Sequence, residues 1–207
     1  MKVLLINGSP HEKGCTFTAL TEVEKELKNA GIETEIIQIG KKPIRGCTAC
    51  GHCKKNPGRC VFSDDPVNEI LEKAETADGF VFGSPVYYAS CNGAMIALMD
   101  RMFYAGNHFR LKPAACVVSA RRAGTTAALD QLSKYPLISG MPLVASQYWN
   151  MVHGNNPEEA VQDLEGMQIM RALGKNMAWL LKCIQAGRNA EVPEPEREKR
   201  VWTNFIR

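Results

Sequence analysis

A run of apolar residues followed by a small-residue loop and a helix constrains the fold more than any other part of this chain. Residues 3–6 are all apolar, which is typical of a strand buried on both faces of a parallel sheet. Gly8, Ser9 and Pro10 end the strand, and from Thr16 onward apolar residues recur every three or four positions. Such a segment can bind an anion, because the first N–H groups of a helix lack partners and its dipole favours negative charge.

The loop between this strand and this helix matches neither of the two common nucleotide-binding motifs. Cys15 follows Gly14 where a P-loop has lysine, and the G-x-G-x-x-G pattern is absent. The hydroxyl groups of Ser9, Thr16 and Thr18 suit a terminal phosphate monoester. An ordinary strand-to-helix turn without a ligand explains the loop alone equally well.

Length and charge limit the classes of protein that the chain can belong to. Its 207 residues are enough for one domain with a sizeable core. A net charge of +3 is too small to indicate a nucleic-acid or membrane partner. No apolar run reaches the ~18 residues of a membrane span, and the first run is too short for a signal peptide. We therefore expect a cytoplasmic protein.

Alternation of strands and helices predicts an α/β fold. Five strands are expected over residues 3–6, 34–39, 80–82, 114–119 and 142–145, with helices between them and a long helix over 157–185. With right-handed crossovers, the expected architecture is a flavodoxin-like, doubly wound, five-stranded parallel sheet of order 2-1-3-4-5 with helices on both faces. Ligands of such sheets bind where the strand order reverses, here between the first and third strands.

Three loops leave the predicted sheet at its carboxyl edge. Residues 8–15 and 84–91 flank the point of reversal, and the second loop offers aromatic side chains to a planar ring. Alternatively, its two tyrosines only cover the edge of the sheet. A third loop contains Arg121, whose charge could stabilise a reduced flavin ring, although surface arginines near a helix start are also common.

Cysteines in the loop over residues 41–62 form the pattern C-x2-C-x2-C-x6-C. The four residues are Cys47, Cys50, Cys53 and Cys60. Thiolates at every third position typically hold a cubane iron–sulfur cluster, whereas zinc sites more often use two separated C-x2-C pairs. Iron–sulfur cluster, zinc and unmetallated thiols all remain open from this spacing alone. Without a secretion signal, disulfides are not expected.

Several motifs together resemble the iron–sulfur flavoproteins, a group within the flavodoxin-fold NAD(P)H-dependent FMN reductases. The motifs are Ser9-Pro10 with Gly14-Cys15-Thr16, the four cysteines followed by Asp64-Asp65, Ser84-Pro85-Val86-Tyr87 before Asp100-Arg101, and Gly166-Met167-Gln168. The resemblance covers residues 1–187. It implies FMN, a [4Fe–4S] cluster, and a homodimer or homotetramer in which cluster and flavin approach each other across subunits.

The resemblance assigns each cofactor to a set of residues. FMN is expected at Ser9, His11, Gly14, Cys15, Thr16, Pro85, Val86, Tyr87, Tyr88, Ser119, Arg121 and Gly124. The cluster is expected at Cys47, Cys50, Cys53 and Cys60. No side chain is assigned as an acid or base, because flavin chemistry supplies the electron step.

Three functions are compatible with these features. The first is an FMN-dependent oxidoreductase that transfers electrons between a reduced donor, FMN and a [4Fe–4S] cluster. The donor would be NAD(P)H or a reduced electron-carrier protein, and the acceptor a small molecule. The second is a cluster-free NAD(P)H-dependent FMN or quinone reductase. The third is an electron carrier without a substrate, which the slightly basic charge disfavours because a carrier should expose an acidic face.

The last residues differ in character from the rest of the chain. We expect residues 1–187 to form the FMN-binding domain, with the cysteine loop 41–62 inserted, and residues 188–207 to form an extended arm. Trp202 and Phe205 near its end are large and apolar. We expect them to be buried against a partner subunit, although fraying is the usual state of a chain end.

Overall fold

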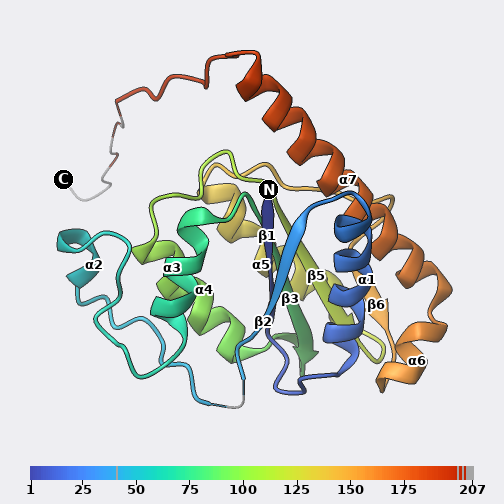
Figure 1. Cartoon of the computed structure of the whole chain (residues 1–207). Helices are drawn as coiled ribbons and strands as arrows, with labels where there is room; N and C mark the ends of the chain where they lie inside the picture. The colour runs from blue at the N-terminus through green and yellow to red at the C-terminus, as the bar shows by residue number, and fades with distance from the viewer. Residues whose placement is uncertain (41, 200, 202, 204–207) are drawn as a thin grey trace.

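A parallel sheet forms the centre of the molecule. The computed structural model describes residues 1–40, 42–199, 201 and 203. The strands β1 (Lys2–Asn7), β2 (Glu33–Gln38), β3 (Gly79–Tyr87), β5 (Ala114–Ala120) and β6 (Met151–His153) pair in parallel in the order β2-β1-β3-β5-β6 (Figure 1). This is the predicted order of five parallel strands. A sixth strand that was not predicted, β4 (Ser90–Cys91), pairs antiparallel with the end of β3.

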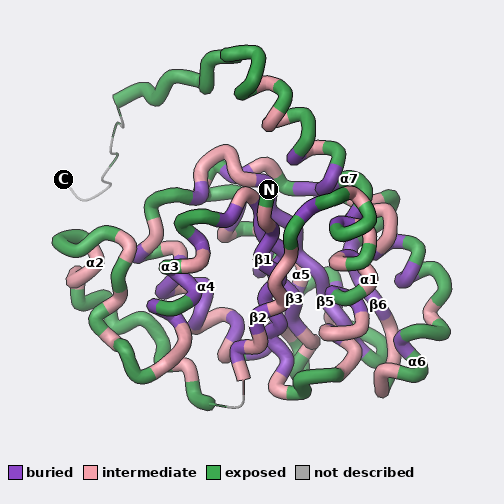
Figure 2. The backbone as a smooth tube through the Cα atoms, in the orientation of Figure 1, coloured by how far each residue is buried: buried purple, intermediate pink, exposed green. Residues whose placement is uncertain are grey.

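Helices cover both faces of this sheet, as predicted. On one face lie α1 (Cys15–Asn29), α6 (Pro157–Gln162) and α7 (Leu164–Asn189), and on the other lie α3 (Val67–Thr76), α4 (Gly93–Ala105) and α5 (Thr125–Ile138) (Figure 1). Along β1, Val3 and Leu5 pack toward α1, whereas Leu4 and Ile6 pack toward α3 and α4. Both faces of the strand are buried, which explains its uninterrupted apolar run (Figure 2).

The fifth parallel strand lies later in the chain than predicted. Residues 142–145 make a single bridge, Leu143 with Ala114, while β6 pairs with the last part of β5. The segment 142–145 and β6 both lie along the same edge of β5. The N–H of Val144 donates to the carbonyl of Ala114, and the N–H of Val118 donates to the carbonyl of Asn150. Between these two contacts, where every residue is described, the chain is not paired with β5. A strand of three residues is too short to show a pattern in sequence.

The predicted long helix is divided into α6 and α7 by Asp163. One carboxylate oxygen of Asp163 accepts the N–H of Gly166 at 2.9 Å, capping α7, and the other accepts the N–H of His153 at 2.7 Å. A Cβ atom at Gly166 would lie 2.3 Å from the Asp163 carboxylate, so this cap requires glycine. Asp163 thereby fixes the start of α7 against β6.

The cysteine loop and the arm both lie outside the sheet. The loop connects β2 to α3 and contains the short helix α2 (His52–Lys55). After α7 the chain runs extended and exposed, and Arg110 donates to the carbonyl of Pro195 at 2.7 Å. Trp202 and Phe205, the predicted anchors of the arm, lie outside the described residues. Among the helices that are described, none is both long and apolar enough to cross a membrane.

Candidate functional site

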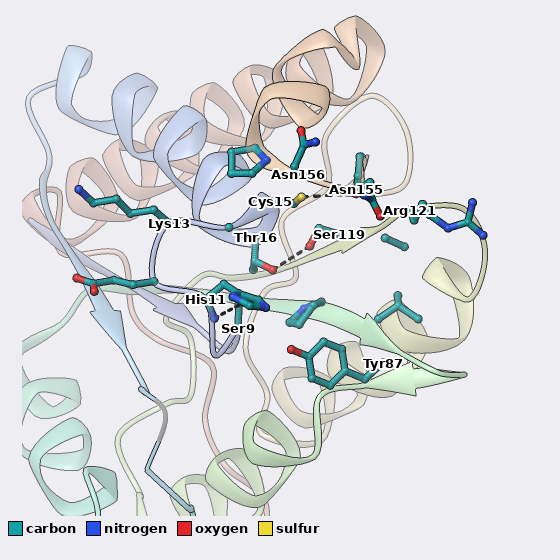
Figure 3. A pocket seen from close by; sticks show the side chains of 17 residues that line it. Ser9, His11, Lys13, Cys15, Thr16, Tyr87, Ser119, Arg121, Asn155 and Asn156 are labelled. Atoms are coloured by element: carbon teal, nitrogen blue, oxygen red, sulfur yellow. Dashed lines mark hydrogen bonds between the residues drawn. The ribbon is translucent and has the colours of Figure 1, made fainter.

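A cavity of about 630 Å³ opens at the carboxyl edge of the sheet, within the range of ~300–1,000 Å³ typical of small-molecule sites. The end of β3 and the loops that follow β1, β5 and β6 form its walls (Figure 3). Most of the predicted FMN residues line it, namely Ser9, His11, Gly14, Cys15, Thr16, Pro85, Val86, Tyr87, Ser119 and Arg121. The structure therefore brings together residues from three separate predicted loops.

Two of the predicted FMN residues do not line this cavity. Tyr88 is fully exposed at the tip of the β3–β4 hairpin, with φ of 58°. Gly124 has φ of 88°, and a Cβ atom there would lie 2.8 Å from a methyl group of Val86. Gly124 thus permits the close approach of Val86, which itself lines the cavity.

The loop after β6 contributes a wall that was not predicted. It consists of Gly154, Asn155, Asn156 and Pro157, and Glu12, Lys13 and Ala120 complete the lining. The residues 154–157 were missed because the fifth strand was expected at 142–145. Once the strand is placed at β6, its carboxyl end meets the same edge of the sheet as the other three loops.

Buried polar side chains fix the loop after β1. Asn7 accepts the N–H of Ser9 at 3.1 Å, and the Ser9 hydroxyl accepts the N–H of His11 at 3.1 Å. Gln38, at the end of β2, donates to the Ser9 carbonyl at 2.6 Å and accepts from Asn7. The conformation of the loop is therefore set by the neighbouring strand ends.

The start of α1 presents hydrogen-bond donors to this cavity. No side chain caps the helix, since Gly14 occupies the N-cap position. The hydroxyls of Thr16 and Ser119 lie 2.8 Å apart and are buried. The Cys15 thiol donates to the Gly154 carbonyl at 3.5 Å, and burial raises the pKa of this thiol, so it remains protonated. Uncapped N–H groups with adjacent hydroxyls can bind an anion.

The opposite wall of the cavity is less polar. Pro85, Val86 and Tyr87 form the last part of β3, where Pro85 pairs with β5 and the other two residues pair with β4. Burial raises the pKa of the Tyr87 phenol, which is therefore neutral at physiological pH. Arg121 is exposed, and in Figure 3 its side chain extends away from the Thr16–Ser119 pair. This wall offers contact area to a planar group.

The four cysteines of the loop share a second cavity of about 150 Å³. Cys47 and Cys50 are exposed, whereas Cys53 and Cys60 are half-buried. Within the described residues, no set of three or more histidine, cysteine or acidic side chains converges on a single metal ion. The four cysteines therefore lie around one hollow, and in the described residues they do not surround a single point.

Comparison with known proteins identifies the family. Residues 1–156 match the family described as NADPH-dependent FMN reductase. An iron–sulfur flavoprotein of Methanocaldococcus jannaschii is 34% identical over 194 residues, covering 89% of this chain and 100% of the relative. One from Methanosarcina thermophila is 31% identical over 198 residues, covering 91% and 100%.

A solved structure shows the same fold with little sequence similarity. The WrbA-like flavodoxin from Agrobacterium tumefaciens superimposes with a TM-score of 0.61 at 12% identity, covering 88% of this chain and 97% of its own. This likeness confirms the flavodoxin-like fold. The chain accordingly belongs to the NADPH-dependent FMN reductase family, among the iron–sulfur flavoproteins, and is an FMN-dependent oxidoreductase.

Proposed function

We propose that this chain transfers electrons from NAD(P)H or a reduced electron-carrier protein to a small-molecule acceptor, using FMN and a [4Fe–4S] cluster. The observation that carries the FMN assignment is the buried Thr16–Ser119 hydroxyl pair beside the uncapped start of α1. The two hydroxyls and the uncapped N–H groups of α1 place several hydrogen-bond donors together at one point of the cavity, as a phosphate monoester needs. The cluster assignment rests on the cavity that the four cysteines share.

The residues of the larger cavity fit FMN. Its phosphate would be held by the backbone N–H groups at the start of α1 and by the hydroxyls of Ser9 and Thr16. The ring would lie along the wall of residues 85–87, beside residues 119–121 of the adjacent strand and loop. When bound, FMN supplies hydride and single-electron chemistry, so the chain needs only to bind and orient it. Tyr87 would shape the access of donor and acceptor to the ring.

The residues of the smaller cavity fit an iron–sulfur cluster better than a single ion. A cluster is bound by thiolates that surround a body several ångströms across, so its ligands need not converge on one point. Four thiols around a hollow of about 150 Å³ match this arrangement. Lys54, Lys55 and Arg59 in the same loop would offset part of the negative charge of a thiolate-bound cluster. When bound, the cluster supplies one-electron transfer.

Separation of the two cavities favours an oligomer. No residue lines both cavities in the part of the chain that the structure describes. The FMN cavity lies at the carboxyl ends of the strands, whereas the cysteine cavity borders the last turns of α4. We therefore expect electrons to pass from the flavin cavity of one subunit to the cysteine cavity of another, in a homodimer or homotetramer.

The test is an absorption spectrum with iron and flavin analyses on protein purified without oxygen. We expect bound FMN, and broad absorbance near 400 nm with about four irons per chain. FMN should also bind far more tightly than riboflavin, which lacks the phosphate. Equal affinity for FMN and riboflavin would contradict the phosphate assignment.

A cluster-free NAD(P)H-dependent FMN or quinone reductase is the second candidate. The observation that favours it is the lack of convergence of cysteine side chains, in the described residues, on a metal position. In this case the cysteine loop would serve as a lid. Protein that contains FMN but no iron after anaerobic purification would support this function over the first.

A further inference from the structure

Arg101 connects the core of the protein to the cysteine loop. It lies on α4, and its side chain is 1% exposed although arginine is rarely buried. Its guanidinium forms an ion pair with Asp65, whose side chain is 2% exposed. It also donates to the carbonyls of Arg45 and Phe62, at 3.1 and 3.2 Å. The two terminal nitrogens of the guanidinium, Nη1 and Nη2, make all of these contacts.

The third nitrogen of Arg101 points at a cysteine. Its Nε–H donates to the sulfur of Cys60 at 3.2 Å. If Arg101 only anchored the loop to the core, a carbonyl oxygen would be a better acceptor for this N–H, because sulfur is a weaker one. The contact with Cys60 therefore points to a role beyond anchoring the loop.

The backbone of Cys60 is fixed independently of its sulfur. Asn68, at the start of α3, accepts the N–H of Cys60 at 2.8 Å and donates to its carbonyl at 3.1 Å. The same amide also donates to the Phe62 carbonyl at 3.0 Å. Helix α3 thus holds the main chain of Cys60, while α4 holds its side chain.

The first cysteines of the loop are held differently. Cys47 and Cys50 are exposed, and the Cys47 sulfur accepts a local hydrogen bond from the N–H of Ala49 at 3.4 Å. The site therefore has a rigid end at Cys60 and a more open end at Cys47 and Cys50. Such preorganisation of one ligand by surrounding hydrogen bonds is how proteins orient metal-binding side chains.

We infer that Arg101 is a positioning residue, which orients the Cys60 sulfur toward the cysteine cavity and raises the reduction potential of a cluster held there. The inference rests on the proposed cluster. Reduction adds one electron, supplied by the donor through the flavin, and so makes the cluster and its thiolates more negative. A hydrogen bond to a ligand sulfur stabilises this more negative form.

Two variants separate the hydrogen bond from the charge. Arg101→Lys keeps the positive charge but removes the Nε–H donor. The double variant Arg101→Met with Asp65→Asn removes both members of the buried ion pair, so the local net charge is unchanged and no unpaired charge is left inside. Arg45→Gln is the matched control. Arg45 also lies over the Phe62 ring, at 4.7 Å, but its side chain pairs with exposed Asp64 and not with Cys60.

The first measurement is hydrogen exchange of the segment 58–63 in metal-free, full-length protein. Because both variants lose the bond to the Cys60 sulfur, exchange should be about five- to tenfold faster in Arg101→Lys than in wild type. It should be at least as fast in the double variant, which also loses the contacts with the Arg45 and Phe62 carbonyls. The Arg45→Gln control should match wild type. Unchanged exchange in both Arg101 variants would overturn the positioning role, whether or not a cluster binds.

The second measurement is the reduction potential of the iron-loaded protein by spectroelectrochemistry. Both Arg101 variants should have a lower potential than wild type and should release iron faster to a chelator, while Arg45→Gln should not. Faster exchange with an unchanged reduction potential would show that Arg101 only anchors the loop, and would overturn the inference that it raises the potential. A wild-type protein that binds no iron would instead refute the proposed cluster, and the exchange result would still decide the positioning role.

Discussion

The hydroxyl oxygens of Thr16 and Ser119 lie 2.8 Å apart, although these residues are 103 positions apart in the chain. Thr16 belongs to the first turn of α1, and Ser119 to the last part of β5. Both residues are almost completely buried, at 1% and 3% exposure. The pair joins the helix that would hold the FMN phosphate to strand β5, whose end lines the same cavity.

Replacement of Thr16 by alanine should weaken FMN binding by about 1–3 kcal/mol. The reason is that a buried phosphate oxygen, or the Ser119 hydroxyl, is left without a partner. The measurement is titration of flavin-free protein with FMN, followed by quenching of flavin fluorescence. Riboflavin affinity should change less, because riboflavin has no phosphate.

Thr18→Ala is the control for this experiment. Thr18 lies on the same helix, but its hydroxyl donates to the Gly14 carbonyl at 3.2 Å and does not line the FMN cavity. An equal loss of FMN affinity in both variants would attribute the effect to helix α1 in general and contradict the assignment of Thr16 to the phosphate.

Gly8→Ala should destabilise the protein and weaken FMN binding. The loop after β1 passes so close to β3 that a Cβ atom at Gly8 would lie 2.7 Å from the Gly83 carbonyl oxygen. Backbone must therefore move, at a cost of about 1–3 kcal/mol in the free energy of unfolding. Urea unfolding measures the cost. Gly93→Ala is the control, because nothing lies within 4 Å of that Cβ position, and it should leave stability unchanged or slightly increased.

The fold was largely predictable because the central strands are buried on both faces and therefore show apolar runs in the sequence. The apolar runs of β1, β3 and β5 are buried on both faces, which marks them as central parallel strands. The edge was harder, since β6 has only three residues and follows a segment, 142–145, that is more strand-like in sequence but makes one bridge. Edge strands depend on a neighbour for their pairing, and sequence does not show that neighbour.

The candidate site was predictable where it follows strands that were correctly placed. Ser9, Thr16 and Ser119 follow or end such strands and meet in one cavity. The loop from Gly154 to Pro157 was missed together with β6. The contact of Arg101 with Cys60 was not predictable at all, because it depends on how α4 packs beside the cysteine loop, 41 residues earlier in the chain.

Cys50→Ser should remove most of the iron while FMN remains bound. Serine binds iron less well than thiolate, and Cys50 shares no cavity wall with the flavin residues. Iron and flavin analyses of anaerobically purified protein measure both effects. Cys183→Ser is the control, as Cys183 is an exposed cysteine on α7 outside the loop. If both variants retain iron equally, Cys50 is not a ligand.

Deletion of residues 191–207 should weaken the assembly of subunits. The arm is held to the domain through Arg110, which donates to the Pro195 carbonyl and pairs with Glu194 at 3.7 Å. Beyond this contact the sequence offers Trp202 and Phe205 to a partner. Sedimentation velocity measures the shift to smaller species. Glu196→Gln, which removes one exposed charge of the arm outside the Arg110 contacts, should behave as wild type. An unchanged assembly after deletion would show that the arm has no part in it.

Asp65→Asn should lower the free energy of unfolding by about 3–5 kcal/mol. The substitution leaves the buried guanidinium of Arg101 without its counter-charge, which is costly because water cannot replace the lost partner. Asp64→Asn is the matched control at the adjacent position. Asp64 is 65% exposed and pairs with exposed Arg45, so its loss should cost no more than about 1 kcal/mol. Urea unfolding of the two variants, both metal-free, compares them directly. Equal stabilities of the two variants would show that water reaches Arg101 when residue 65 is asparagine. The cysteine loop would then not be anchored through this ion pair.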